Sequence, residues 1–183
     1  MAIMTRSPQT LREADRRLVA AWAADCAERV VDVFEAERPG DDRPRAAIAR
    51  ARAFANGTLP TDIGIRDRFG GGSSTADARS PAAIAACRAA GQASAVCHMG
   101  AHALGAAGYA ADARRLAAPD AIDGFEDEIR WQLAHMSAAV RAALRTLPPL
   151  GENRSGPLGI GLLTRGHVGT AIRELQRAIA DAR

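Results

Sequence analysis

Two histidines four residues apart are the first feature of this sequence that could do chemistry. His98 and His102 would lie on one face of a helix, at the spacing that lets two imidazoles share a metal ion. The run His-Met-Gly-Ala-His lacks the glutamate that follows the first histidine of a metalloprotease helix, so it excludes that enzyme class. A third ligand would have to come from Asp25, Cys26 or His135. We favour the interpretation that both histidines form hydrogen bonds to carbonyls or carboxylates inside a helical bundle. We therefore predict no bound metal and no cofactor.

A second group of polar side chains surrounds the first tryptophan. Trp22, Asp25, Cys26 and Arg29 share a helix face by the three-four rule. One interpretation is an ion pair that orients Arg29 against a neighbouring element. The other is a polar cluster that faces the two histidines, with Cys26 as a nucleophile assisted by an imidazole. The candidate ligand-binding residues are therefore Trp22, Asp25, Cys26, His98 and His102. No residue is assigned a catalytic role.

The histidines lie in a long uncharged stretch that the other elements must surround. Between Arg88 and Asp112, 23 consecutive residues carry no formal charge, and most are Ala, Gly, Ser or Cys. A helix without charged side chains on any face is typically buried. A continuous helix over 81–112 would be roughly 45 Å long, which exceeds a compact domain of this size. We therefore expect a break near Gly100, Gly105 or Gly108.

Apolar residues at helical spacing predict four further helices, and no segment alternates with period two for long enough to form a strand. These helices cover about 8–38, 43–55, 120–147 and either 167–182 or 170–182. The segment 58–79 has no lasting period and contains a Gly/Ser-rich run, so we expect a mobile loop there. The fold class is all-α: one domain over 1–183, a bundle of about five main helices around the central Ala/Gly-rich helix, with a C-terminal extension over 150–183.

Composition excludes several classes of partner. All 24 basic side chains are arginine, 21 residues are acidic, and aromatic residues make up 4% of the chain. The sequence therefore shows neither a stripe of basic residues that could follow a phosphate backbone nor an aromatic surface on which bases could stack. We do not expect nucleic acid as a partner. The uncharged stretch is too polar for a membrane span. The N-terminus shows no secretory signal, and three unpatterned cysteines indicate reduced thiols. We expect a cytoplasmic protein, and the sequence does not predict its oligomeric state.

Three segments resemble the immunity-five-like family of bacterial immunity proteins. The most specific is 15–57, with a tryptophan helix that continues through Asp-Cys-Ala-Glu at 25–28 and an Asp-Arg-Pro-Arg turn at 42–45. The resemblance resumes over 89–111 and at Glu-Ile-Arg-Trp-Gln-Leu, 128–133, and it covers about half of the chain. It implies a small helical protein that neutralises a toxin, and it carries over no catalytic residues.

The function that follows from this resemblance is a binding protein that covers the active surface of a cognate protein toxin. The alternative is a small helical enzyme or a small-molecule-binding resistance protein, with a pocket lined by the five candidate residues. We favour the binding protein over the enzyme. An exposed apolar patch would support the first interpretation, and an enclosed cavity holding the histidines would support the second.

Overall fold

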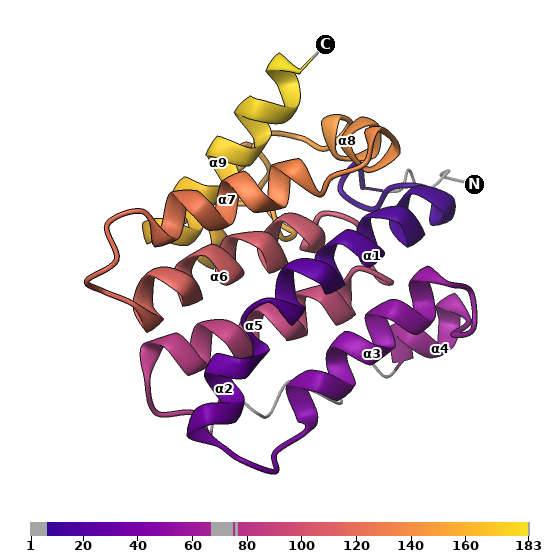
Figure 1. The fold of residues 1–183 in the computed structure, drawn as a ribbon. Helices are drawn as coiled ribbons and strands as arrows, with labels where there is room; N and C mark the ends of the chain where they lie inside the picture. Colours follow the sequence, from indigo (N-terminus) through magenta and orange to yellow (C-terminus); the bar gives the residue numbers. More distant parts are fainter. Residues whose placement is uncertain (1–6, 67–74, 76, 183) are drawn as a thin grey trace, which may run out of the picture.

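The computed structural model describes residues 7–66, 75 and 77–182, and regular structure in this part of the chain is helical (Figure 1). The described residues form no strand, only an isolated bridge between Asn153 and Gly159. The predicted all-α class is therefore confirmed. The helices of the described ranges are α1 (Glu13–Glu28), α2 (Val31–Glu37), α3 (Arg43–Ala55), α4 (Thr61–Arg66), α5 (Pro81–Ala95), α6 (His102–Ala117), α7 (Gly124–Ala134), α8 (Ala138–Arg145), the short 3₁₀ helix η2 (Leu162–Thr164) and α9 (Gly166–Asp181).

The described residues contain nine α-helices where the sequence predicts about five main ones. Three of the expected helices are each divided in two, into α1 and α2, α5 and α6, and α7 and α8. The remaining additional helix is α4, which lies inside the expected loop at 58–79. Of that loop, 67–74 and 76 lie outside the described residues, so the expectation of mobility there stays a prediction.

Helix α1 begins later than predicted because the chain before it is committed to other contacts. Leu11 has a positive φ of 62°, which a right-handed helix cannot include. The carbonyls of Gln9 and Thr10 accept hydrogen bonds from the backbone of Ala101 and Gly100, at 3.0 Å in each case. The spacing of Leu11, Leu18 and Trp22 predicts that Leu18 faces the core, and this is wrong, because Leu18 is exposed and its neighbour Val19 is fully buried.

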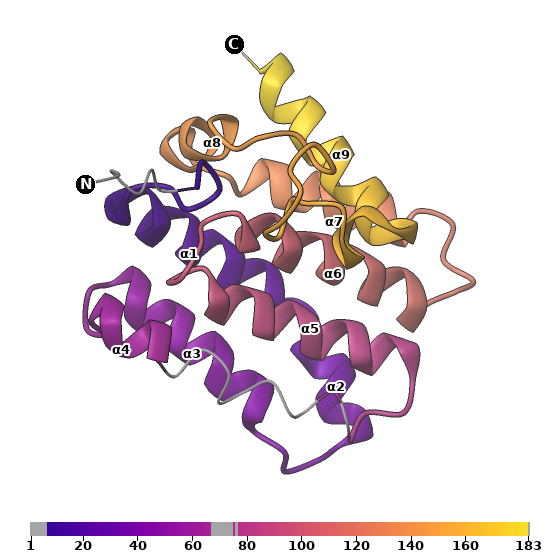
Figure 2. The ribbon, with the colours of Figure 1, turned by 180° about the vertical axis from the view of Figure 1, so that it is seen from behind.

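The long uncharged stretch folds into two packed helices, α5 and α6. Ser80 caps α5 by accepting a hydrogen bond from the backbone N–H of Ala83 at 3.1 Å, as its position before a proline predicts. The helix ends at Ala95, and α6 begins at His102, so the break near Gly100 is confirmed. The two helices run side by side (Figures 1 and 2), and α6 also packs against α1, α7 and α9.

The second half of the chain covers α6. The helix predicted over 120–147 is interrupted at 135–137, where Ser137 caps α8 by accepting a hydrogen bond from Val140 N at 3.2 Å. The last helix agrees with its expected position, and α9 buries Ile172, Leu175 and Ile179 against the core. No described helix has the length and apolarity needed to cross a membrane.

The side chain of Glu37 joins the end of α2 to the start of α5. The Glu37 carboxylate accepts hydrogen bonds from the backbone N–H groups of Arg79 and Ser80, the second at 2.9 Å. Hydrogen bonding by Ser80, followed by that of Arg79, holds the pKa of Glu37 below its ordinary value of 4.5. A carboxyl group whose pKa is lowered by folding contributes stability above its unfolded pKa and loses it as the pH falls through the folded pKa.

We therefore predict that Glu37→Gln lowers the free energy of unfolding at neutral pH, and that the difference from wild type shrinks as the pH falls below 4.5. Urea unfolding at about pH 7 and about pH 3 measures both differences. Glu152→Gln is the control, because Glu152 is exposed and forms no ion pair with a described residue. A deficit in Glu37→Gln that is the same at both pH values would contradict the prediction.

Candidate functional site

The two histidines lie at the junction of α5 and α6, with His98 in the connection and His102 at the first position of α6. Both are half-buried, and their ring centres are 6.5 Å apart with planes tilted by 41°. His102 Nδ1 lies 2.8 Å from Gln92 Oε1, so one ring is oriented by an amide on α5. Within the described ranges, no three His, Cys, Asp or Glu side chains form a group that could hold a metal ion.

We predict that His102→Ala loses about 1 kcal/mol of stability, because the hydrogen bond to Gln92 is lost. A metal held by both imidazoles would add its binding free energy to folding, so a chelator would then lower the melting temperature. We expect no chelator effect on the wild type. His167→Ala is the control for loss of an exposed imidazole, since His167 lies at the start of α9 and its ring contacts Phe125 edge-on, with ring centres 5.6 Å apart. Near-stoichiometric metal in the purified wild type, lost in His102→Ala, would overturn this prediction.

The candidate residues of α1 have contacts with different neighbours. Trp22 is buried, and its indole N–H donates a hydrogen bond to the carbonyl of Gln132 at 3.0 Å. Asp25 instead lies at the surface, where its carboxylate accepts a hydrogen bond from Arg52 of α3 at 2.8 Å. Asp25 therefore does not form the ion pair with Arg29 that the i, i+4 spacing allows.

Cys26 is fully buried, and burial raises the pKa of its thiol well above its ordinary value, with a further contribution from the nearby Glu128 carboxylate. A thiol that stays protonated is a poor nucleophile, so its environment is typical of a structural cysteine. A pocket shared by Cys26, Trp22, Asp25 and the two histidines stays a prediction.

Arg29 is oriented by a buried carboxylate that is not among the five candidate residues. Its Nε donates to both carboxylate oxygens of Glu128 on α7, at 3.0 and 2.9 Å, and the Glu128 side chain is only 1% exposed. Arg114 of α6 contributes a second guanidinium, with Nε 3.8 Å from the same carboxylate. Gln132 completes the cluster by donating to Ala107 O at 3.1 Å and to Glu128 Oε1 at 3.3 Å. This cluster joins α1, α6 and α7.

The sequence does contain a signal for this cluster. Glu128 and Gln132 are four residues apart and lie beside Phe125 and Ile129, on the apolar side of a helix. A charged residue on an apolar face is buried only when it is paired. Its partner Arg29 is 99 residues away and could not be chosen from spacing alone.

At the surface of this cluster, Trp131 contacts Arg29 and His135. The guanidinium of Arg29 lies 4.0 Å from the centre of the indole, and the His135 ring stacks on the indole at 4.0 Å between centres with planes 19° apart. His135 Nδ1 is also 2.9 Å from the carbonyl of Trp131. Each group is therefore already engaged within the chain, which is typical of a structural cluster.

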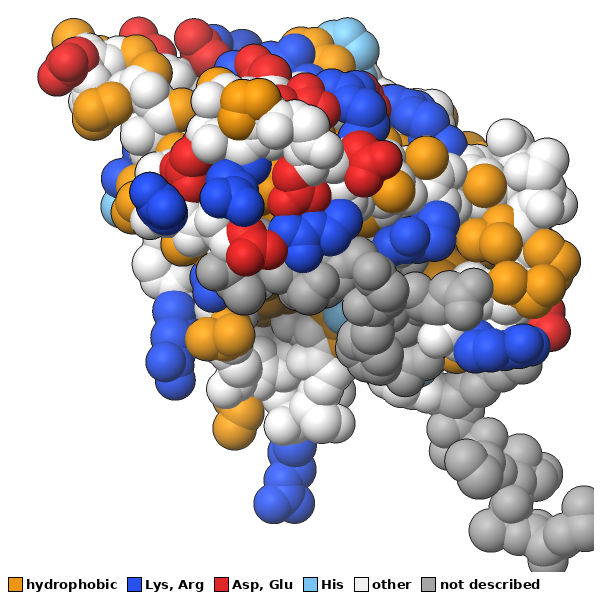
Figure 3. All heavy atoms as spheres, turned by 90° about the horizontal axis from the view of Figure 1, so that it is seen from below, with side chains coloured by type: hydrophobic (Ala, Val, Ile, Leu, Met, Phe, Trp, Pro, Cys, Tyr) orange, Lys and Arg blue, Asp and Glu red, His pale blue; other side chains and the backbone are white. Residues whose placement is uncertain are grey.

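The surface over α2 and α3, which is the lower side of the molecule in the view of Figure 1, carries intermingled basic and acidic side chains (Figure 3). Many of them are paired: Arg45 reaches Glu28 and Glu35 at 2.7 and 2.6 Å, and Arg52 reaches Asp25. Exposed pairs of this kind contribute little to stability individually. They also neutralise one another, so this surface offers little net charge to a partner.

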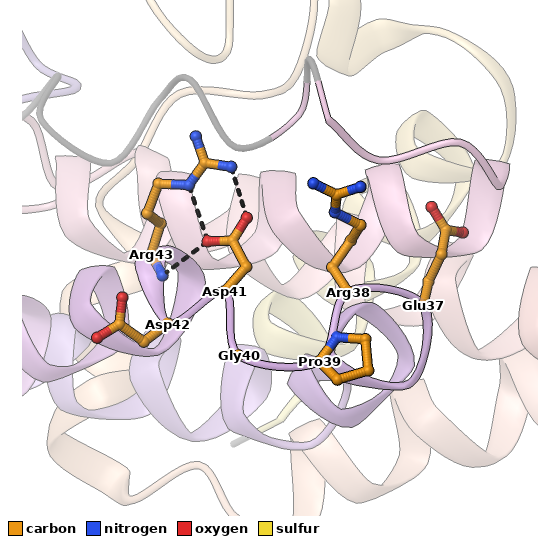
Figure 4. A pocket seen from close by; sticks show the side chains of 7 residues that line it. All are labelled: Glu37, Arg38, Pro39, Gly40, Asp41, Asp42 and Arg43. Atoms are coloured by element: carbon orange, nitrogen blue, oxygen red, sulfur yellow. Dashed lines mark hydrogen bonds and ion pairs between the residues drawn. The ribbon is translucent and has the colours of Figure 1, made fainter.

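An open cleft lies beside the turn between α2 and α3, and its lining residues, 37–43, include none of the five candidate residues (Figure 4). The Asp41 carboxylate is held there by the Arg43 side chain, with Nε 2.8 Å from Oδ1. Arg43 also reaches Asp77 at 2.5 Å. The charged groups of the turn thus serve to connect segments of the fold.

The segment between α8 and α9 presents two large apolar side chains to solvent. Ile160 is 72% exposed and Leu162 is 66% exposed, while Leu158 and Leu163 on either side are buried. The segment belongs to the predicted C-terminal extension over 150–183. Two apolar residues separated by one position, in a run rich in glycine, were the available signal.

Together, these contacts define an all-helical protein whose polar motif residues hold its helices together. The chain belongs to the family described as Imm-5 like putative immunity protein, whose model matches residues 9–139. No curated protein and no solved structure matches the chain. Membership of an immunity-protein family implies a protein partner in general.

Proposed function

We propose that this chain is an immunity protein that binds a cognate bacterial toxin in the cytoplasm and neutralises it by covering the toxin's active surface. The observation that carries the proposal is the family match over residues 9–139. Binding by surface complementarity needs no catalytic group and no cofactor in the immunity protein.

The environment of the polar residues supports this proposal over an enzyme. Cys26, the candidate nucleophile, is fully buried with a raised thiol pKa, and Trp22 donates its indole N–H to another part of the core. By contrast, apolar side chains that a partner could cover are present at the surface, at Ile160 and Leu162. Exposed apolar side chains are typical of a protein contact when they are grouped and held in place.

The test is co-expression with the polypeptides encoded beside the gene of this chain. Each neighbouring polypeptide is first induced alone, to identify one that arrests growth. Co-expression of this chain is expected to restore growth, and the two purified proteins are expected to co-elute from a size-exclusion column. The control is an inactive variant of the toxic polypeptide, which should still co-elute.

Two outcomes would contradict the proposal. In the first, no neighbouring polypeptide arrests growth or this chain fails to restore it. In the second, growth is restored but no complex forms, which would favour chemical modification of the toxin or of its target over neutralisation by binding.

A further inference from the structure

The segment 150–165 is attached to the body of the protein by hydrogen bonds. The buried side chain of Gln9 binds it twice: Nε2 donates to Ser155 O at 2.8 Å, and Oε1 accepts from Leu158 N at 2.9 Å. Gly151 N donates to Leu158 O at 2.9 Å, and Ile160 N donates to Asn153 O at 3.2 Å. These bonds fix the backbone up to Ile160. After Ile160, Thr164 N donates to Gly161 O and Arg165 N donates to Leu162 O, at 3.2 Å in each case.

The segment is also anchored by packing. Leu158 is fully buried and Leu163 is 5% exposed, so the side chains that flank Ile160 and Leu162 enter the core while those two point out. A loop that is already ordered loses less conformational entropy when a partner binds. Ile160 and Leu162 are therefore preorganised for contact.

Positive charge lies on both sides of the exposed pair. Arg154 and Arg165 are exposed, and neither makes an ion pair with another described residue. Arg154, Ile160, Leu162 and Arg165 thus combine two exposed apolar side chains with two arginines, and we call these four residues the tail surface. The segment 150–165 also carries one exposed carboxylate, that of Glu152. The family match ends at residue 139, so the tail surface lies outside the segment matched by the family model.

We infer that the tail surface is the docking site for the toxin, and that its complement on the toxin is an apolar pocket bordered by carboxylates. This inference rests on the proposed function and adds the position and chemistry of the contact. Apolar residues at the centre of an interface supply most of the affinity, and charges at its border set the association rate and the specificity.

Two other occupants fit the tail surface less well. In a two-fold contact between copies of this chain, Arg154 and Arg165 of one copy would face the same residues of the other, and the like charges would repel. A membrane surface would take up only two apolar side chains, which is a small buried area for stable attachment. An acidic protein surface satisfies both the apolar pair and the arginines.

The experiment measures binding of the growth-arresting neighbouring polypeptide to purified full-length variants. Replacing both Ile160 and Leu162 with alanine is expected to weaken binding by about tenfold or more, mainly through faster dissociation. Replacing both arginines with alanine is expected to slow association by roughly threefold to tenfold and to reduce its dependence on salt. Ile122→Ala is the matched control, because Ile122 is 93% exposed but precedes α7. It should bind like the wild type.

The outcomes separate this inference from the proposed function. If the wild type binds the polypeptide and the Ile160/Leu162 double variant binds equally well, the toxin docks elsewhere and the proposed function stands. If the wild type binds no growth-arresting neighbour, the proposed function fails and the inference fails with it. Sedimentation that shows a wild-type dimer lost in the double variant would assign the surface to a second copy. Binding to phosphatidylglycerol vesicles that is lost in the double variant would assign it to lipid. Either result overturns the inference.

Discussion

The variant Glu128→Ala is expected to lose about 3 kcal/mol of unfolding free energy, since breaking a buried ion pair by removing one partner costs about 3–5 kcal/mol. The low end of this range applies because Arg29 and Arg114 are about one-third exposed at their side chains, so water solvates part of the charge left behind. Gln132 also loses one of its acceptors. For a chain of this length, the melting temperature should fall by about 6–12 °C.

Glu128→Gln separates charge from shape in this prediction. The amide keeps an oxygen that can accept a hydrogen bond from Arg29 but loses the carboxylate charge, so we expect a smaller loss than in the alanine variant. Asp127→Ala is the surface control, because Asp127 is next in sequence but pairs with Arg130 at the exposed side of α7. Thermal unfolding of the three variants measures the order. Equal melting temperatures for Glu128→Ala and Asp127→Ala would show that the buried pair does not stabilise the fold.

The elements that the sequence predicts best are those whose apolar period is regular from end to end. In α3 the apolar residues at helical spacing, Ala47, Ile48, Ala51 and Phe54, are all buried. In α9 the same holds for Ile172, Leu175 and Ile179. Each of these helices has one clear apolar face, so local pattern and tertiary packing agree.

The interruptions of the helices were harder to predict, because local sequence and tertiary contacts disagree there. Nothing at 29–30 breaks a helix by itself, yet α1 ends at Glu28, and Arg29 pairs with Glu128. At 135–137 a signal was available, since Ser137 is a good N-cap, but the apolar stripe continues through Met136 and hides it.

The candidate site shows the same limit. Spacing on one helix correctly placed His98 near His102, but the Gln92 contact exists only because α5 and α6 fold against each other. Spacing also suggested Asp25 as a partner for Arg29, whereas each pairs with a different helix. Contacts between elements depend on topology, which a single sequence with no strand pattern leaves open.

The second large effect is expected at Gly105 on α6, where Gly105→Leu should cost about 3 kcal/mol or more. A Cβ atom there would lie 2.3 Å from Gln92 Oε1 and 3.0 Å from Leu163 Cδ1. Overpacking a core typically costs about 1–3 kcal/mol. Gln92 could yield only by giving up its contact with His102, which adds about 1 kcal/mol.

Gly91 on α5 provides the matched control for this prediction. A Cβ atom added at Gly91 meets no atom of the described residues within 4 Å, and the residue lies inside a helix. Gly91→Ala should therefore raise stability by about 0.5–1 kcal/mol, because alanine has the higher helix propensity. Gly105→Ala should lie between wild type and Gly105→Leu, because its single methyl group still meets Gln92. Chemical unfolding gives all four free energies. A Gly105→Leu variant as stable as the wild type would show that α5, α6 and the segment 150–165 are not packed as closely as the contacts at Gly105 require.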